Sequence, residues 1–562
     1  MRASEGILSG YENTVLIKHS EITGDFPNTV AYDDLGCRAL GGVLKANKYV
    51  GGRLMQTYTK AENHVLAIAA TRLGKTTSCV IPQVLSFARQ SVKRGMIISD
   101  PKGELYRLLS AELRKDGYNV LLLNLRDYKH SENWNPVLPI FRKYVRALKL
   151  EEEVEVVSTP EGLRNSFQGR IYSEQTELDG AIENVRSHLL KDVDGDIDRF
   201  MFALIPPDEA KDQYWNSSAR QWGKALLWAM LEDVEPKEGR EAITEETFSL
   251  NTMFSIAESL SGDRQYDDHH YFSGRGSDSE ALKNAKCVIE NADTTRQCIV
   301  STFYSRVQAF RNCTVRLITG CSSFDMSRLT GEKPTAIFIS YPDETKVYYS
   351  VISSFVQEAY TYLLNYANDR PDGKLEVPFY FILDEFGNFP RIADFDTVIS
   401  ACGGRNIWFY LVLQSYAQLD NVYGKNVAEI IRDNLNVHIF LGSNNPSTIE
   451  QFSKECGETS RISPKSALSG TKGEIEVFET ETIPLIPRSL LAGLKPGECV
   501  VTEANCGYVM LSKMERYYDC PEFRDLELSS DKDYVGSADP LDRKYAYKIS
   551  FEKKSGRGLF GL

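Results

Sequence analysis

A short segment near the start of the chain has the residue types of a phosphate-binding loop. Residues Ala69–Thr76 follow the pattern G-x-x-x-x-G-K-[ST], except that an alanine replaces the first glycine. Small residues let backbone N–H groups turn toward phosphate oxygens, and the amino end of the following helix favours negative charge. Lys75 is then expected to reach the β- and γ-phosphates of a nucleotide, and the Thr76 hydroxyl to ligate Mg²⁺. The alternative interpretation is an ordinary strand–turn–helix connection.

Two carboxylates far downstream have the placement of a hydrolytic pair. They follow the apolar run Pro378–Leu383, which is typical of a strand buried on both faces. At the carboxyl end of such a strand, they would emerge where α/β sheets bind ligands. Asp384 is expected to hold Mg²⁺, and Glu385 to act as a general base toward water. The alternative is that both residues only open the next helix at the positive end of its dipole.

A third polar residue follows another buried-strand pattern. Residues Asn406–Leu413 are strongly apolar, and Gln414 comes directly after them. We expect Gln414 to sense the γ-phosphate or to orient water, unless it only caps the next helix. The predicted nucleotide-binding residues are Ala69, Ala70, Thr71, Arg72, Leu73, Gly74, Lys75, Thr76, Thr77 and Asp384. The predicted catalytic residues are Lys75, Glu385 and Gln414, and the predicted Mg²⁺ ligands are Thr76 and Asp384.

The composition is that of a globular protein with room for several domains. The chain has 562 residues, of which 42% are hydrophobic and 25% charged, and its net charge is −13. This charge argues against a protein that coats nucleic acid, but not against DNA contacts confined to one basic loop or ring. The 11 cysteines show no C-x-x-C pair, so we expect reduced, packed thiols. No apolar stretch reaches the ~18–20 residues of a membrane helix, so we expect a soluble chain.

Strand-like and helical patterns alternate over much of the chain. The strand-like runs include His64–Ala69, Gly95–Ser99, Asn119–Leu123, Thr335–Ser340 and Val437–Leu441. Strands separated by helices in this way predict a mainly parallel sheet with right-handed crossovers.

The strand rhythm stops in the middle of the chain, where helical periodicity takes over. Thr176–Leu190 and Gln213–Leu231 are examples, and a loop is expected at Asp192–Asp198. We therefore predict an α/β P-loop NTPase core in two segments, residues 61–140 and 326–525, around an all-α insertion domain at 141–325. A small β-rich lead-in occupies residues 1–60, and a tail occupies 526–562.

Several ordered blocks of sequence together resemble one known family. They are Ser99–Leu105, Asn133–Pro136, Ile382–Asn388, Gln414–Leu419 and Phe440–Ser443. The chain resembles the TraG-like coupling proteins of conjugative type IV secretion systems, a family of RecA-like hexameric ATPases that translocate DNA. The likeness covers most of residues 64–520.

The resemblance implies a RecA-like motor that uses ATP and Mg²⁺, with the all-α insertion at the mouth of a channel. It implies a homo-hexamer with ATP between neighbouring subunits. The implied partners are relaxase-bound DNA, expected to be single-stranded, relaxosome proteins, and the ATPases and membrane components of the secretion channel. The expected location is the cytoplasm, at the inner face of the cell membrane.

Two departures from the family pattern shape these expectations further. Family members usually begin with membrane helices, so anchoring is expected through a partner or through a missing N-terminal segment. Members also carry an arginine ahead of the glutamine strand, which acts on the ATP of the neighbouring subunit. Here that slot holds Gly403, and Arg405 is the candidate for this catalytic role.

Three functional hypotheses follow from these observations. The favoured one is an ATP-driven coupling protein that recruits relaxase-bound DNA and drives it into the secretion channel. The second is an ATP-binding docking platform for secreted proteins with little motor activity. The third is a ring-shaped DNA translocase outside conjugation. The carboxylate Glu385 favours hydrolysis, because a scaffold has no need of a general base.

Overall fold

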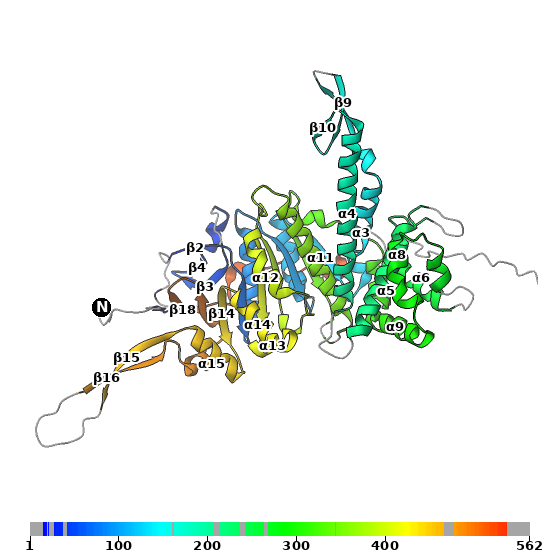
Figure 1. Cartoon of the computed structure of the whole chain (residues 1–562). Helices are drawn as coiled ribbons and strands as arrows, with labels where there is room; N and C mark the ends of the chain where they lie inside the picture. Colours follow the sequence, from blue (N-terminus) through cyan, green and yellow to red (C-terminus); the bar gives the residue numbers. More distant parts are fainter. Residues whose placement is uncertain are drawn as a thin grey trace, which may run out of the picture. The chain divides into compact units, whose positions relative to one another are not determined.

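The computed structural model describes residues 15–18, 21, 27–37, 42–159, 162–206, 213–235, 242–262, 268–342, 344, 346–465 and 477–536. The chain divides into two compact units. Figure 1 colours the chain along its sequence, so that each segment of a unit can be found by its residue numbers. Unit 1 comprises Met1–Leu123, Met326–Glu344 and Tyr360–Tyr534, and unit 2 comprises Asn124–Asp325, Thr345–Ala359 and Val535–Leu562. Among the described residues, none of the helices combines the length and apolar character needed to cross a bilayer.

Unit 1 is built on a 10-stranded sheet with the order β1-β18-β17-β14-β5-β13-β12-β6-β11-β7. The strands are β1 (Val15–Ile17), β5 (Val65–Ala69), β6 (Gly95–Asp100), β7 (Asn119–Asn124), β11 (Thr335–Ser340), β12 (Phe379–Leu383), β13 (Ile407–Leu413), β14 (Val437–Gly442), β17 (Glu498–Glu503) and β18 (Tyr508–Lys513). Neighbouring strands from β14 through β11 are paired in parallel, whereas β17 runs antiparallel to both of its neighbours. The predicted mainly parallel α/β sheet is confirmed.

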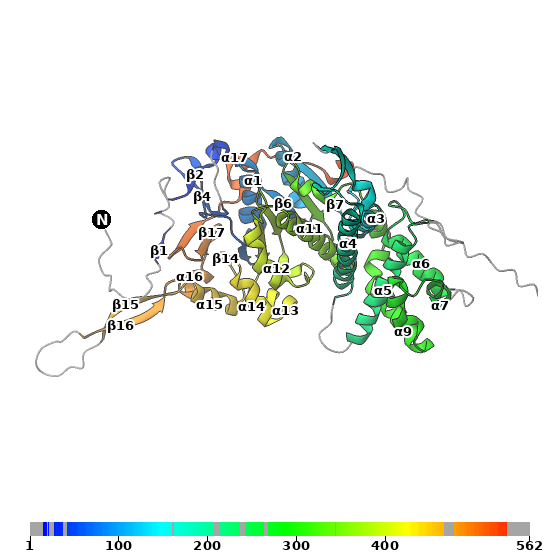
Figure 2. The ribbon, with the colours of Figure 1, turned by 45° about the horizontal axis from the view of Figure 1, so that its top comes forward.

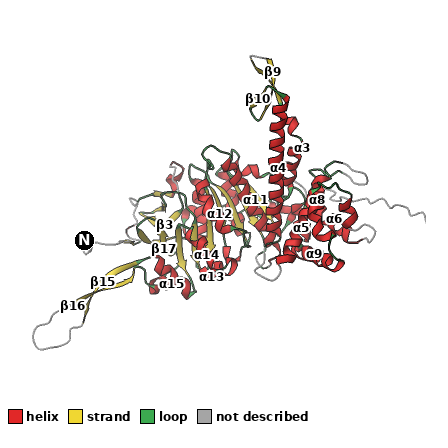
Figure 3. Ribbon diagram, viewed as in Figure 1, coloured by secondary structure: helices red, strands yellow, loops and turns green. Residues whose placement is uncertain are grey.

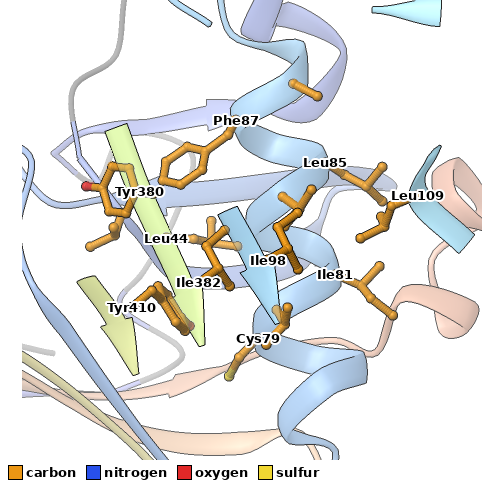
Figure 4. Packing of buried hydrophobic residues seen from close by; sticks show 14 of the residues in the cluster. Leu44, Cys79, Ile81, Leu85, Phe87, Ile98, Leu109, Tyr380, Ile382 and Tyr410 are labelled. Atoms are coloured by element: carbon orange, nitrogen blue, oxygen red, sulfur yellow. The ribbon is translucent and has the colours of Figure 1, made fainter. Parts of the chain in front are cut away.

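Helices cover both faces of this sheet, because successive side chains of its central strands, which point to opposite faces, are apolar and buried. On one face, Ile98, Ile382 and Tyr410 lie in a buried cluster with residues of α1 (Ile81–Arg89) and α2 (Glu104–Lys115), as Figure 4 shows. On the other face, the Phe409 ring lies 4.9 Å from that of Phe381 and 5.0 Å from that of Phe395 in α12 (Phe395–Cys402). The other helices of this unit are α13 (Tyr416–Tyr423), α14 (Lys425–Asp433), α15 (Pro446–Glu455), α16 (Arg488–Ala492) and α17 (Pro521–Arg524).

The β-rich lead-in forms part of the core of unit 1. Strands β2 (Thr29–Ala31), β4 (Arg53–Tyr58) and β3 (Leu44–Val50) form an antiparallel sheet in that order. Its buried residues, among them Leu44 and Tyr58, belong to the same cluster as Val65 of β5 and Phe87 of α1. Strand β1 instead extends the main sheet by pairing in parallel with β18. A separate pair, β15 (Glu458–Lys465) and β16 (Val477–Pro484), forms an antiparallel hairpin.

Unit 2 is mainly helical (Figure 3). Its helices are α3 (Leu138–Leu148), α4 (Gln175–Leu204), α5 (Gln213–Glu232), α6 (Leu250–Gly262), α7 (Asp268–Ser273), α8 (Glu280–Ile289), α9 (Asp293–Arg306) and α10 (Cys313–Thr319). Figure 2 shows α5, α6 and α9 gathered together. A further long helix, α11 (Tyr349–Asn368), begins among residues of unit 2 and ends among those of unit 1.

The description of residues 141–325 as all-α is incomplete, because this segment also contains a small sheet. Strands β8 (Glu155–Thr159), β9 (Gly162–Phe167) and β10 (Arg170–Tyr172) pair antiparallel at the end of the α3–α4 pair (Figure 1). The turn between β9 and β10 is made by Gln168 and Gly169, both with positive φ. Two such residues between short strands are typical of a tight hairpin, and Gly169 is the turn residue that the sequence shows there.

The loop predicted at Asp192–Asp198 is wrong, since α4 continues through it. Two of its aspartates bind α5: Lys224 Nζ lies 2.8 Å from Asp194 and 2.9 Å from Asp198. Trp228 Nε1 also donates to Asp194. A cluster of acidic residues suggests a solvated loop when read alone, but here basic and indole groups of the next helix neutralise it.

Candidate nucleotide-binding site

The predicted site residues follow strands that end at the same edge of the main sheet. The register pairs Leu383 with Ser99 on one side and with Leu411 on the other. It also pairs Leu413 with Ile68. The strand that ends before Gln414 therefore lies between the strand of the predicted phosphate loop and the strand of the two carboxylates.

The loop after β5 has the backbone of a tight anion-binding turn. Arg72 and Gly74 have φ values of 69° and 91°, and the Ala70 N–H donates to Gly442 O at 2.9 Å. A Cβ atom added to Gly74 would lie 3.0 Å from Ser78 Oγ, so this position requires glycine for its conformation and its space. The first turn of the following helix, η3 (Lys75–Val80), has π-helical bonding. Ala69 is fully buried at the end of β5, where its small side chain fits.

Lys75 and Glu385 form an ion pair across the edge of the sheet. The Lys75 Nζ donates to Glu385 Oε1 at 2.9 Å, and the two side chains are 11% and 12% exposed. Glu385 has a left-handed backbone with φ of 55°, which turns it away from the line of β12. A lysine and a carboxylate held this close at a glycine turn are suited to serve as a cation for phosphate and a base for water.

Thr76 and Asp384 form the second contact of the site. The Thr76 hydroxyl donates to Asp384 Oδ2 at 2.6 Å, and Asp384 Oδ1 accepts from the Glu385 N–H at 2.9 Å. Burial raises the pKa of Asp384, while the nearby Lys75 charge and the Thr76 hydroxyl act to lower it. A hydroxyl oxygen and a carboxylate oxygen side by side are the hard donors that Mg²⁺ prefers.

Gln414 lies beside the phosphate loop. Its side-chain Oε1 accepts from the Thr71 hydroxyl at 3.2 Å. Its backbone is fixed on both sides, because its N–H donates to Gln418 Oε1 and its carbonyl accepts from the Ser443 hydroxyl. The structure thus brings together residues from all three predicted segments: the loop, the carboxylate pair and the glutamine.

The structure adds Lys102, which the sequence reasoning did not single out. Its Nζ lies 3.6 Å from Glu385 Oε1, so Glu385 faces two lysines. The block Ser99–Leu105 was the available signal, since it begins with the last two residues of β6 and continues past the end of that strand at the same edge. Its Asp100 is structural: the buried carboxylate accepts from the Tyr106 N–H at 2.8 Å, and burial raises its pKa to about 6.

Arg405 is the predicted residue that does not join this group. It lies in the 3₁₀ turn η10 (Gly403–Arg405) before β13, whereas the site residues follow the strands. Its Nε donates to Asn368 Oδ1 at 3.0 Å, and its Nη1 donates to Ala401 O at 2.9 Å. Arg405 therefore lies at the opposite edge of the sheet from the site of its own subunit.

Comparison with known proteins identifies the family. The model of the family described as "Type IV secretory system Conjugative DNA transfer" matches residues 28–499. The chain belongs to this family. Among curated members of such systems, the conjugal transfer protein TraG of Escherichia coli is 22% identical over 449 residues, which are 78% of this chain and 61% of TraG. The protein VirD4 of Rhizobium rhizogenes is 22% identical over 396 residues, which are 70% of this chain and 49% of VirD4. This chain thus spans between about half and three fifths of the length of these curated relatives.

Solved structures of a conjugative coupling protein share the fold. The bacterial conjugative coupling protein TrwBdeltaN70 in unbound form has a TM-score of 0.52 at 16% identity, with 86% of this chain and 91% of that chain covered. The plasmid coupling protein TrwB in complex with the ATP analogue ADPNP has a TM-score of 0.53 at 15% identity, with 92% and 96% covered. The RecA-like α/β architecture and the TraG-like resemblance are therefore confirmed.

Proposed function

We propose that the chain is the ATP-driven coupling protein of a conjugative type IV secretion system. In this proposal it recruits relaxase-bound DNA and drives the DNA toward the channel as a homo-hexamer. The α/β segments 61–140 and 326–525 form the motor, and the insertion 141–325 meets the transferred substrate and its partner proteins. Family membership supports the system, and the pairing of Lys75 with Glu385 at 2.9 Å is the observation that supports hydrolysis.

The residues of the site fit ATP and Mg²⁺. The turn at Arg72 and Gly74 directs the loop backbone around the start of η3, and Lys75 brings a cation there. The oxygens of Thr76 and Asp384, 2.6 Å apart, are suited to hold Mg²⁺ together. Related TrwB structures are complexes with ADPNP and with ADP and Mg²⁺, which supports the same ligands here.

Each side chain then has a definite task. Bound Mg²⁺–ATP supplies a phosphoryl group that can be transferred to water. Lys75 would hold the β- and γ-phosphate oxygens through Nζ, and Thr76 and Asp384 would hold the metal. A carboxylate oxygen of Glu385 accepts the proton of the attacking water. Gln414 orients that water or senses the γ-phosphate through its side-chain amide.

Replacement of Lys75 by alanine tests whether the loop binds nucleotide. Lys75→Ala should abolish binding of ATP and ADP, because it removes the charge that pairs with the phosphates. Nucleotide affinity measured by calorimetry in the presence of Mg²⁺ is the readout. Lys60→Ala, which removes an exposed lysine outside the site, is the matched control and should bind as the wild type does. Wild-type affinity in Lys75→Ala would show that the loop is only structural.

DNA-stimulated turnover separates the motor from the docking platform. A motor should hydrolyse ATP faster when single-stranded DNA is added, whereas a platform that uses ATP only to hold its ring together should not respond. The acidic net charge of −13 is the observation that favours the platform. Turnover that is unaffected by DNA would therefore favour a docking platform for secreted proteins.

A further inference from the structure

One arginine near the phosphate loop comes from a segment that the sequence reasoning did not connect with the site. Arg516 follows β18 and directly precedes the 3₁₀ turn η11 (Tyr517–Asp519). It lies beyond residue 499, where the match to the family ends.

The backbone around Arg516 is fixed on both sides. Before it, the Glu515 N–H donates to Asn47 O at 2.8 Å, and the fully buried Asn47 side chain donates back to Glu515 O. After it, Cys520 and Phe523 are buried in the core. The fold therefore holds the backbone of Arg516 in place independently of any ligand.

The side chain of Arg516 approaches the phosphate loop at Gly74. A Cβ atom added to Gly74 would lie 3.8 Å from Arg516 Nε, and 3.2 Å from Thr77 Oγ1. Gly74 immediately precedes Lys75 and η3, where loop backbone N–H groups meet phosphate. The guanidinium thus lies beside the part of the loop that binds anions.

Arg516 has no carboxylate at ion-pair distance among the residues that the structure describes. Its neighbour Glu515 pairs instead with Lys513. The guanidinium lies 5.8 Å from the centre of the Tyr518 ring, which steers it without neutralising it. A half-buried guanidinium with a fixed fork of donors is suited to bind phosphate oxygens.

We propose that Arg516 is a further ligand of the nucleotide phosphates, supplied by the same subunit. The inference rests on the proposed nucleotide site and adds a binding residue to it. Arg516 approaches the loop at Gly74. Glu385 contacts the loop at Lys75 instead, and Gln414 contacts it at Thr71. Arg516 therefore donates to the phosphates that ATP and ADP share, and it does not discriminate between them.

Equilibrium binding of ADP and of ADPNP with Mg²⁺ tests this assignment without turnover. Arg516→Gln should raise the Kd of both nucleotides by about tenfold, which corresponds to about 1.4 kcal/mol. Arg516→Lys keeps the charge without the fork and should give an intermediate Kd. Arg524→Gln is the matched control, because Arg524 is an exposed arginine at the end of α17 in the same segment. The melting temperature of each nucleotide-free variant shows whether it is folded.

The outcomes distinguish the two proposals. Unchanged affinity in a folded Arg516→Gln protein overturns the role of Arg516, as does an equal loss in Arg524→Gln. A loss for ADPNP alone overturns the assignment to the shared phosphates. If the wild-type protein binds neither nucleotide, the proposed function itself has failed.

Discussion

The charged side chains of the candidate site are paired with one another. Lys75 and Glu385 are both largely buried, so each of them would be left as an unpaired buried charge without the other. Lys102 also approaches Glu385, but its side chain is 53% exposed, so solvent weakens that contact. In the proposed function, a nucleotide phosphate would therefore compete with Glu385 for Lys75.

Replacement of Glu385 by glutamine should separate binding from hydrolysis. The amide keeps the shape of the side chain but cannot accept a proton from water, so ATP turnover should fall by about 10²–10⁴-fold. Because the amide pairs less strongly with Lys75, binding of ADPNP should be as tight as in the wild type or tighter. Turnover and affinity are measured on the same preparation.

The matched control for this change is Glu429→Gln, which alters an exposed carboxylate on α14 and should leave both quantities unchanged. Wild-type turnover in Glu385→Gln would reduce Glu385 to a residue that only shapes the turn after β12.

The amino-acid sequence identified some residues of the candidate site and missed others. Lys75, Thr76, Asp384, Glu385 and Gln414 stand at the ends of buried strands, and parallel pairing brings strand ends together. Their catalytic roles stay predictions. Lys102 and Arg516 were not predicted as site residues, since their contacts depend on local backbone and on the path of the chain. The Glu385 carboxylate reaches Lys102 from a left-handed backbone, and Arg516 arrives through the turn after β18.

At the scale of elements, a buried histidine joins the phosphate-loop strand to its neighbours at the opposite edge of the sheet. His64, only 4% exposed, precedes β5, and its Nδ1 accepts from the Phe409 N–H of β13 at 3.0 Å. Its Nε2 lies 3.7 Å from Cys402 Sγ of α12. Since the Phe409 N–H must donate, the ring is neutral with its proton on Nε2. Burial accordingly lowers the pKa of His64 to about 4.

This histidine should make the stability of the protein sensitive to acid. The pKa of His64 has its ordinary value of 6.5 in the unfolded chain and is lowered by burial to about 4 in the folded chain. The contribution of the neutral His64 ring to the free energy of unfolding is therefore fully present above pH 6.5 and is lost as the pH falls toward 4. Between pH 7.5 and 5 the loss is about 2 kcal/mol in free energy of unfolding.

His64→Asn should flatten this dependence, since asparagine can accept the Phe409 N–H bond but does not titrate. Urea unfolding of both proteins at pH 7.5 and 5 gives the comparison, in which all other titrating groups are shared. Equal losses of stability in the two proteins would show that His64 does not carry the acid sensitivity.

Elements were predictable where one physical signal dominated. The continuous apolar runs of β11 and β13 leave few alternatives to a strand buried on both faces. The sheet β8–β10 was missed because its strands are short and partly polar, and only the buried Phe167 and Tyr172 pack on α4. The extent of α4 was missed because its aspartates gain partners only when α5 folds beside it.

At the scale of the whole molecule, the position of Arg405 bears on whether copies of the chain act together on a nucleotide. It precedes β13, and Gln414 follows it, so the strand separates them by about 20 Å. Arg405 therefore cannot serve the site of its own subunit, and only a second copy of the chain can bring it to a nucleotide. Its present partners, Asn368 Oδ1 and Ala401 O, would equally suit an arginine that joins the ends of α11 and α12.

If Arg405 acts on a neighbouring subunit, Arg405→Ala should spare nucleotide binding and lower hydrolysis by about 10³-fold or more, because such an arginine stabilises charge that develops in the transition state. The control is Asn368→Ala, which removes one partner of Arg405 but keeps the guanidinium. This control should retain hydrolysis if the guanidinium acts elsewhere.

Mixing two inactive proteins gives the sharper measurement. A Lys75→Ala subunit still presents an intact Arg405 to the nucleotide site of an adjacent Arg405→Ala subunit, so mixed assemblies should regain ATP turnover that neither parent shows. The recovered rate should peak at intermediate mixing ratios, since only mixed neighbours form a complete site. An arginine that merely joins two helices predicts no recovery at any ratio, together with a lower melting temperature in both Arg405→Ala and Asn368→Ala. Absence of recovery in assemblies that demonstrably contain both subunits would therefore remove Arg405 from the catalytic site.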